Sequence, residues 1–314
     1  MTVKTVALSA LLLALAVGAA QAEPARINLT ANQQAIHTAK NSAAVALLPP
    51  GFTFAVPGKL TVVVSALNSP PLSVLAEDNR TRIGSDIDMA RLLAESLGLE
   101  LNLVPASWEQ WPLGIASGKY DVALFNIAVT RERKTRFDFA TYRTDTLSFS
   151  VRTHSPIQTI NKPADVAGLK VIVGSGTNQE NILLTWDKQN RAQGLKAAQP
   201  VYVTDDAAAS LALQSGRVDA FFGPHSTAVY KAALTGTTRV VGNGPRSAWV
   251  AATTRKGNGL AAALSEAING TLRSGEYDRV LARWGESDER IARSQVNPPG
   301  MGDGPADELP DKAG

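Results

Sequence analysis

Apolar and polar positions follow one another in blocks that predict strands and helices in turn. Residues 59–65 form a β-branched apolar run typical of a buried strand. Residues 86–97 place apolar side chains along one helical face, and Gly98 ends that pattern. Residues 99–105 predict the next strand, and Ser107 begins a capping-box pattern that predicts a short helix. This alternation predicts an α/β fold with parallel-dominated sheets flanked by helices.

One short pattern occurs twice, almost a hundred residues apart. Ser117-Gly-Lys-Tyr-Asp121 and Ser215-Gly-Arg-Val-Asp219 each follow a predicted helix and precede an apolar run. The glycine can adopt the left-handed conformation that ends a helix. Because helix–Gly–strand sequences are common in α/β proteins, the match can also arise by chance. The alternative is that the chain holds two lobes of one architecture, with equivalent loops after equivalent strands.

Three loops of the predicted sheets would converge on one volume. Ligands of open α/β sheets bind beyond the carboxyl ends of the strands. The loops after Phe125 and Phe222 would then face each other across a cleft, and a third loop, residues 174–177, follows a strand predicted at 169–173. This arrangement predicts a clamp that closes on a small molecule.

Both ends of the chain differ from the middle. Residues 1–22 combine a basic start, an apolar stretch and Ala20-Gln-Ala22, which predicts a signal peptide cleaved after Ala22. The apolar stretch is short of the ~20 residues that span a bilayer, so we expect no direct membrane insertion. Residues 23–57 form an N-terminal extension with a possible helix at 32–48. Residues 286–314, rich in Asp, Pro and Gly, predict a flexible tail.

Composition excludes several classes of function. The formal charge is only +3, on 31 basic and 28 acidic residues, and no block of Lys and Arg predicts nucleic-acid binding. The chain has no cysteine, so it lacks thiol catalysis, disulfides and a lipid-anchoring cysteine after the signal peptide. His37, His154 and His225 have no metal-ligand spacing. We therefore expect a soluble periplasmic monomer, not an enzyme, without a metal or other cofactor.

From the residues alone, several side chains are candidates for ligand binding. Arg131, Arg133 and Arg136 follow a predicted strand end, where a guanidinium can hold a carboxylate through two hydrogen bonds. These residues can equally form a solvated basic turn, and composition does not choose among them. A capping box at Thr177 begins a helix whose N-terminus favours an anionic group. The periodicity around Trp111 favours a place in the core.

Ten short motifs, in order along residues 58–285, resemble the polar amino-acid class of extracytoplasmic solute-binding proteins, the receptors of ABC importers. Each motif is weak by itself, and the ordered series is specific. The motifs are Pro70-Pro71-Leu72, Gly84-Ser-Asp-Ile-Asp88, Ser107-Trp108, Ser117-Gly-Lys-Tyr-Asp121, Thr130-Arg-Glu-Arg133-Lys134, Phe137-Asp-Phe139, Gly176-Thr-Asn-Gln-Glu180, Ser215-Gly-Arg-Val-Asp219, Gly275-Glu-Tyr277 and Arg283-Trp-Gly285.

The resemblance implies a two-lobed periplasmic-binding-protein fold of type II with the ligand cleft between the lobes. Lobe 1 would comprise residues 58–148 and 249–285, and lobe 2 residues 149–248. The implied function is capture of an amino acid or similar small carboxylate and its delivery to an ABC permease. Two alternatives are a periplasmic enzyme similar to cyclohexadienyl dehydratase and a ligand-sensing subunit of a membrane signalling partner.

The resemblance also implies roles for individual residues. Arg133 matches the position that binds the α-carboxylate of the ligand, with Asn126 and Ala128 beside it. Trp111 matches a position that packs on the ligand, contrary to the periodicity. Three positions of the second lobe match groups that close over the same carboxylate. They are Thr177, Asn178 and Gln179.

Three positions depart from the family pattern. Pro224, followed by His225, stands where the family usually has an Asp that pairs with the ligand's α-ammonium. Ala128 replaces a Ser or Thr, and Ser69 replaces a frequent aromatic residue. The carboxylate-binding group is kept and the ammonium-binding group is missing. Since an unpaired buried ammonium is costly, we expect another acceptor or a ligand without that charge, such as a carboxylate or a modified amino acid.

Overall fold

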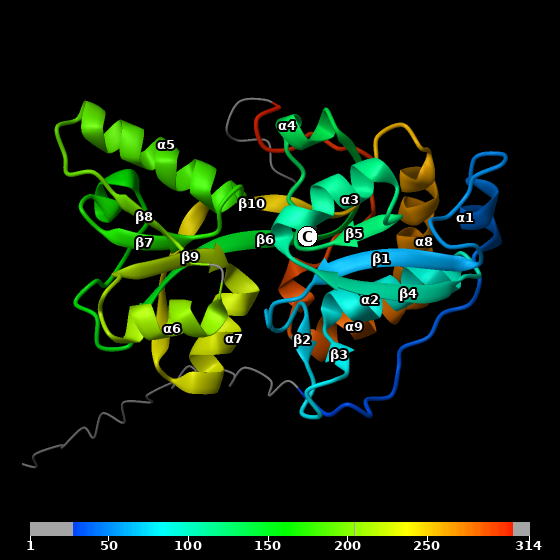
Figure 1. Cartoon of the computed structure of the whole chain (residues 1–314), viewed down its shortest axis with the longest axis horizontal. Coiled ribbons are helices and arrows are strands. Elements are labelled where there is room, and N and C mark those ends of the chain that lie inside the picture. Colours follow the sequence, from blue (N-terminus) through cyan, green and yellow to red (C-terminus); the bar gives the residue numbers. More distant parts are fainter. Residues whose placement is uncertain (1–27, 204, 304–314) are drawn as a thin grey trace, which may run out of the picture.

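Two long strands hold the molecule together, as the computed structural model of residues 28–203 and 205–303 shows (Figure 1). The strands are β1 (Lys59–Ser65), β2 (Val74–Leu75), β3 (Arg82–Ile83), β4 (Glu100–Ala106), β5 (Val122–Leu124), β6 (Phe137–Arg152), β7 (Lys170–Val173), β8 (Gln199–Tyr202), β9 (Ala220–Pro224) and β10 (Thr238–Arg255). The α-helices are α1 (Ser42–Ala46), α2 (Ser85–Ser96), α3 (Trp111–Ser117), α4 (Arg131–Lys134), α5 (Asn178–Ala192), α6 (Asp206–Gln214), α7 (His225–Thr235), α8 (Leu260–Ser274) and α9 (Glu276–Trp284), and the 3-10 helices are η1 (Trp108–Gln110), η2 (Pro163–Val166) and η3 (Ser287–Glu289).

Eight of these strands form one mixed sheet in the order β4-β1-β5-β10-β6-β9-β7-β8. β1 pairs in parallel with β4 and β5, and β7 pairs in parallel with β8 and β9. The long strands β6 and β10 pair with each other in antiparallel orientation. β6 is also antiparallel to its other neighbour β9, and β10 is antiparallel to β5. The predicted α/β class with a mostly parallel sheet is therefore confirmed, with the two parallel parts joined in one continuous sheet.

The two parallel parts lie on opposite sides of the β6–β10 pair (Figure 1). We call the part built on β1, β4 and β5 lobe 1 and the part built on β7, β8 and β9 lobe 2. The proposed crossings between lobes, near residues 148 and 249, fall inside β6 and β10. We propose that the lobes meet at these two positions.

Helices cover both faces of the sheet in each lobe. In lobe 1, α2 and α8 pack on one face through residues such as Leu93 and Leu264, and α3 packs on the other through Trp111 and Ile115. In lobe 2, α5 packs on one face through Leu183 and Trp186. Residues of α6 such as Leu213 pack on the other face. Burial of these apolar stripes positions the loops at the strand ends.

The repeated pattern has the same structural role in both lobes. Gly118 and Gly216 both have positive φ, of 78° and 72°, at the end of a helix. The Asp121 carboxylate then accepts a hydrogen bond from the Thr61 backbone N–H at 2.8 Å, next to β5 and at the start of β1. The Asp219 carboxylate accepts one from the Lys170 N–H at 2.8 Å, next to β9 and at the start of β7. The two lobes thus share one local hydrogen-bonding arrangement, in which an aspartate links two neighbouring parallel strands.

The N-terminal extension packs on lobe 1. Its only helix within residues 28–57 is α1, so the longer helix expected at 32–48 is wrong. Ala44 of α1 is fully buried in the core of lobe 1, and the Ala55 N–H donates to Asp121 at 2.8 Å. The predicted signal peptide lies outside the described residues. None of the described helices combines the length and the apolar character needed to cross a bilayer.

The predicted flexible tail is wrong for residues 286–303, which we call the C-terminal segment. Glu286 is fully buried, and Glu289 and Ile291 are nearly so. The Thr141 backbone N–H donates to the Gln295 carbonyl at 3.0 Å, which joins the segment to β6. The composition misled the prediction because the segment is attached to the sheet largely through polar contacts, such as the hydrogen bond that Glu289 accepts from Arg143 of β6. Residues 304–314 lie outside the described part.

Candidate functional site

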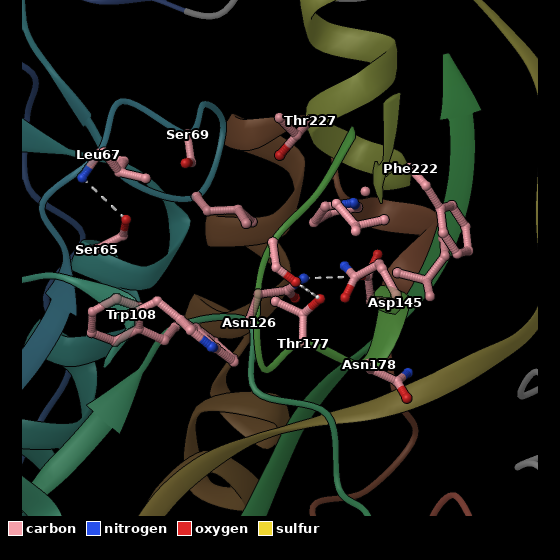
Figure 2. Close-up of a pocket in the computed structure, with 18 of the residues that line it drawn as sticks. Ser65, Leu67, Ser69, Trp108, Asn126, Asp145, Thr177, Asn178, Phe222 and Thr227 are labelled. Carbon is pink, nitrogen blue, oxygen red and sulfur yellow. Dashed lines mark hydrogen bonds between the residues drawn. The ribbon is translucent and has the colours of Figure 1, made fainter. Parts of the chain in front are cut away.

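A cavity of about 250 Å³ lies between the lobes, at the carboxyl ends of strands from both sides (Figure 2). This volume is just below the ~300–1,000 Å³ common for ligand pockets, which suits a small molecule. Eight residues predicted from the sequence line it. They are Ser69, Asn126, Ala128, Arg133, Thr177, Asn178, Gln179 and Pro224. The two other predicted residues, Trp111 and His225, do not line it.

Arg133 brings a positive charge to this cavity without an acidic partner. Its backbone N–H donates to the side chain of the N-cap Thr130 at 3.1 Å, which fixes the start of α4. Its Nη1 donates to the Ala128 carbonyl at 3.0 Å, and its guanidinium carbon lies 5.3 Å from the centroid of the Trp108 ring. Burial lowers the pKa of Arg133 to about 10. Within the described chain its side chain forms no ion pair.

The neighbouring arginines differ from Arg133 in exposure. Arg131 and Arg136 are exposed and do not line the cavity. Of the three candidate arginines, only Arg133 lines the cavity.

Asn126 lines the cavity but uses its amide inside the protein. Its backbone has a φ of 55°, a left-handed conformation that asparagine tolerates better than most residues. Its Nδ2 donates to Asp145 Oδ2 at 2.7 Å, and its Oδ1 accepts a hydrogen bond from Arg143. The side chain therefore orients two charged groups of β6, in addition to any contact with a ligand.

A group of buried ionisable side chains adjoins the cavity, and two of its members, Asp86 and Asp145, line it. We call this group the buried charge cluster: Asp86, Tyr142, Arg143, Asp145, Glu286 and Glu289. Arg143 is fully buried and its Nη1 donates to Glu289 Oε2 at 2.5 Å. The Tyr142 hydroxyl donates to Asp86 at 2.7 Å. Burial raises the pKa of Asp86 and Asp145, and it raises the pKa of Glu286 to about 7. The cluster thus holds four carboxyl groups and one guanidinium.

Lobe 2 presents the N-terminus of α5 to the same cavity. The Thr177 hydroxyl caps the helix by accepting the Glu180 N–H at 3.3 Å, and it donates to the Gly174 carbonyl at 2.7 Å. The unpaired N–H groups of the first turn carry partial positive charge, so Thr177, Asn178 and Gln179 offer a site for an anionic group.

Trp111 is a core residue, which corrects the role that the family resemblance implied. It is 2% exposed and packs on Phe137, with ring centroids 5.0 Å apart. Trp108, one turn earlier, lines the cavity instead and meets Trp111 edge to face at 5.7 Å. The periodicity had favoured this core position.

Pro224 lines the cavity without a charged side chain, and the neighbouring His225 does not line it. Pro224 precedes α7 and pairs with Leu147 across the β6–β9 ladder. The His225 ring Nδ1 lies 2.5 Å from the Ser148 hydroxyl, so His225 is partnered within the protein. Ser69 lines the cavity, and its backbone N–H donates to the Ser73 carbonyl at 2.7 Å.

The sequence reasoning missed four acidic residues of the cavity wall, which are Asp86, Asp145, Asp205 and Asp206, and it also missed the aromatic residue Trp108. Asp206 is paired with Lys231, which also lines the cavity. Asp145 has a detectable signal in the sequence, since Arg143 and Asp145 are charged residues at alternate positions of one face of a buried strand.

Two α/β lobes joined by two long strands, with a small cavity between them, define a clamp of the periplasmic-binding-protein class. The chain belongs to the bacterial extracellular solute-binding proteins, family 3, whose family model matches residues 61–287. The predicted family is therefore confirmed.

The individual relatives and solved structures described below share less than a third of their residues with this chain over most of its length. The L-cystine-binding protein TcyJ of Escherichia coli strain K12 is 29% identical over 217 residues, which cover 68% of this chain and 78% of TcyJ. The solved structure of an ancestral arginine-binding protein bound to arginine has a TM-score of 0.64 at 26% identity, with 72% of this chain and 98% of that chain covered. Cyclohexadienyl dehydratase of Pseudomonas aeruginosa is 40% identical, but over only 57 residues, 18% of this chain and 21% of the enzyme.

Proposed function

We propose that this protein is a periplasmic receptor that binds an amino acid or an amino-acid-like small carboxylate between its lobes and delivers it to an ABC permease. The family membership and the relatives named for amino-acid binding support the ligand class. The predicted signal peptide supports export.

The observation that carries the proposal is the unpaired guanidinium of Arg133 at the cavity. A buried cation without a counter-ion is costly, and a bidentate carboxylate would remove that cost. The Ala128 carbonyl and the Trp108 ring hold the guanidinium in place, so little ordering is needed on binding.

The α5 N-terminus gives the same ligand group a second set of partners from lobe 2. A carboxylate that contacts both Arg133 and the N–H groups at Asn178 and Gln179 would join the two lobes. Because those contacts all form only when the lobes are close, the ligand would favour the closed state by its differential affinity.

The test is thermal unfolding of the mature protein against a panel of L-amino acids, keto acids, sulfonates and simple carboxylates. A ligand at ~1,000 times its dissociation constant adds about 4 kcal/mol of stability, which shifts the melting temperature by several degrees. We expect Arg133→Gln to weaken binding of the ligand found by about 30-fold or more. Arg136→Gln, an exposed neighbour, is the matched control and should bind normally.

Two outcomes would contradict the proposal. Either no compound of the panel stabilises the protein, or a ligand binds equally well to Arg133→Gln. The ligand found is also recovered after incubation, since chemical conversion would identify an enzyme on this fold in place of a receptor.

A further inference from the structure

One carboxylate oxygen of Asp145 makes no hydrogen bond of good geometry within the described chain, although the His225 backbone N–H lies close enough to favour the ionised carboxylate. The residue is 4% exposed and lines the cavity (Figure 2). Its Oδ2 accepts a hydrogen bond from Asn126 Nδ2 at 2.7 Å, whereas its buried Oδ1 has no hydrogen-bond partner among the described residues. Buried polar atoms are nearly always paired, so this atom calls for a partner that enters the cavity.

The charges around Asp145 do not supply that partner. On its own strand, Arg143 points its guanidinium at Glu289 and Asn126. From the other elements, Asp86 on α2 and Glu286 and Glu289 on the C-terminal segment add only negative charge. His225 of α7 favours the ionised form of Asp145 through its side chain and its backbone N–H, but its ring is partnered with Ser148. The surroundings therefore carry more carboxyl groups than cations and favour an incoming positive charge.

The position of Asp145 relative to both lobes fits a cation of the ligand. Leu147 pairs with Pro224, so Asp145 lies on the same face of the sheet, diagonally across from Pro224 and about 7–8 Å away. Pro224 is the position at which the family resemblance led us to expect an acid. Arg133 lines the same cavity from lobe 1, so one unpaired cation and one unpaired carboxylate oxygen border one small volume.

We propose that Asp145 is a ligand-binding residue whose carboxylate binds a cationic nitrogen of the ligand, while Arg133 binds its carboxylate. This inference rests on the proposed function and narrows its ligand class to molecules with both charges, such as a free amino acid. The ligand without an ammonium group, which the sequence suggested as one possibility, is then disfavoured. The cationic nitrogen has two possible sources, the α-ammonium or a basic side chain.

The experiment compares amino acids with their deamino analogues by isothermal titration calorimetry. The pairs are L-arginine and 5-guanidinopentanoate, L-glutamine and 4-carbamoylbutanoate, L-histidine and 3-(imidazol-4-yl)propanoate, and L-cystine and 3,3′-dithiodipropanoate. We expect the wild type to bind the amino acid of at least one pair about 30-fold or more tightly than its analogue. Asp145→Asn should remove that preference and leave the affinity for the analogue within about 3-fold. A preference for L-arginine over L-citrulline that Asp145→Asn removes would identify the side chain as the source.

A matched variant separates a direct contact from a general effect of negative charge. Asp86→Asn also removes a buried carboxylate of the cavity wall, but Asp86 is bonded to the Tyr142 hydroxyl. We expect Asp86→Asn to keep the preference for the amino acid. An equal loss in both variants would overturn the assignment to Asp145.

The wild type alone also tests the inference, should Asp145→Asn fail to fold. Because a cation binds the ionised carboxylate, affinity for the amino acid should fall as the pH is lowered through the raised pKa of Asp145, and affinity for the analogue should not. Glu286→Gln should keep this difference. Equal affinities of amino acid and analogue at every pH, together with equal affinities for L-arginine and L-citrulline, would overturn the inference and leave Arg133-dependent carboxylate binding intact. Absence of any Arg133-dependent binding would instead overturn the proposed function.

Discussion

Trp108 and Trp111 are only three residues apart in the sequence, but Trp108 lines the cavity and Trp111 lies in the hydrophobic core. Ser107 and Gln110 begin a 3-10 turn, with the Ser107 N–H donating to Gln110 Oε1 at 3.0 Å. That turn directs Trp108 towards the guanidinium of Arg133, and the following helix directs Trp111 into the sheet. The indole that a ligand can contact is therefore that of Trp108.

We predict that ligand binding changes the tryptophan fluorescence of the protein mainly through Trp108. Trp108→Phe should lose most of the ligand-induced signal and weaken binding, with a small effect on stability, because the ring is only partly buried. Trp111→Phe should keep the signal and lower the free energy of unfolding by about 1–3 kcal/mol, because it leaves space in the core. Fluorescence titration and urea unfolding measure both effects. The reverse pattern would place Trp111 at the ligand.

At the scale of residues, the sequence identified cavity-lining residues that belong to a recognisable motif. It missed cavity-lining residues whose importance depends on contacts with distant parts of the chain. The strand end left Arg131, Arg133 and Arg136 as candidates, and the family resemblance selected Arg133 by its place in the motif Thr130-Arg-Glu-Arg133-Lys134. Asp145 was missed because its interest depends on Asn126 and on the cavity, both distant along the chain. Trp111 was misassigned by motif position, since position in a motif does not specify the face of a helix.

At the scale of elements, strands and helices with a strong apolar pattern were predicted almost to the residue. β1 has the predicted bounds, and α2 and β4 differ from prediction by one residue. The C-terminal segment was missed because its contacts are polar. Asn297, for example, accepts the Phe139 N–H at 2.9 Å and donates to Asp138 at 2.9 Å. Propensity and hydrophobic periodicity carry no signal for such contacts.

We predict that the C-terminal segment stabilises the protein through Glu289. Glu289→Ala would leave the guanidinium of Arg143 buried without its acidic partner, and breaking a buried pair in this way costs about 3–5 kcal/mol. The control is Asp288→Ala, an exposed neighbour that should change stability by less than about 0.5 kcal/mol. Urea unfolding followed by circular dichroism measures both. Equal stability of the two variants would show that the segment contributes little through this pair.

At the scale of the whole molecule, the sequence predicted two lobes but not that one sheet continues through both. Among the strands of the described residues, only β6 and β10 cross between the lobes, and their ladder contains shifts of register at Val240/Gly242, Asn243/Ser247 and Val250/Ala251. Such bulges bend and twist a strand pair locally. The shift at Asn243/Ser247 lies beside the cavity-lining residues Asp145 and Ala248. Bending at this point would therefore move the two halves of the ligand site relative to each other.

We predict that the lobes approach each other when ligand binds, with the bend in the β6–β10 pair. Because the chain contains no cysteine, Leu113→Cys on α3 and Leu184→Cys on α5 would provide the only two thiols for donor and acceptor dyes. Both positions are exposed, at 72% and 43%, and lie on different lobes (Figure 1). Energy transfer should increase on saturation with the amino acid identified above, and Arg133→Gln should require about 30-fold more ligand for the same change. If transfer stays constant at saturation, the ligand binds without closure. The contacts of Arg133 and of the α5 N-terminus would then have to form in one preformed cavity, and the differential affinity that we expect to drive delivery to a permease would be absent.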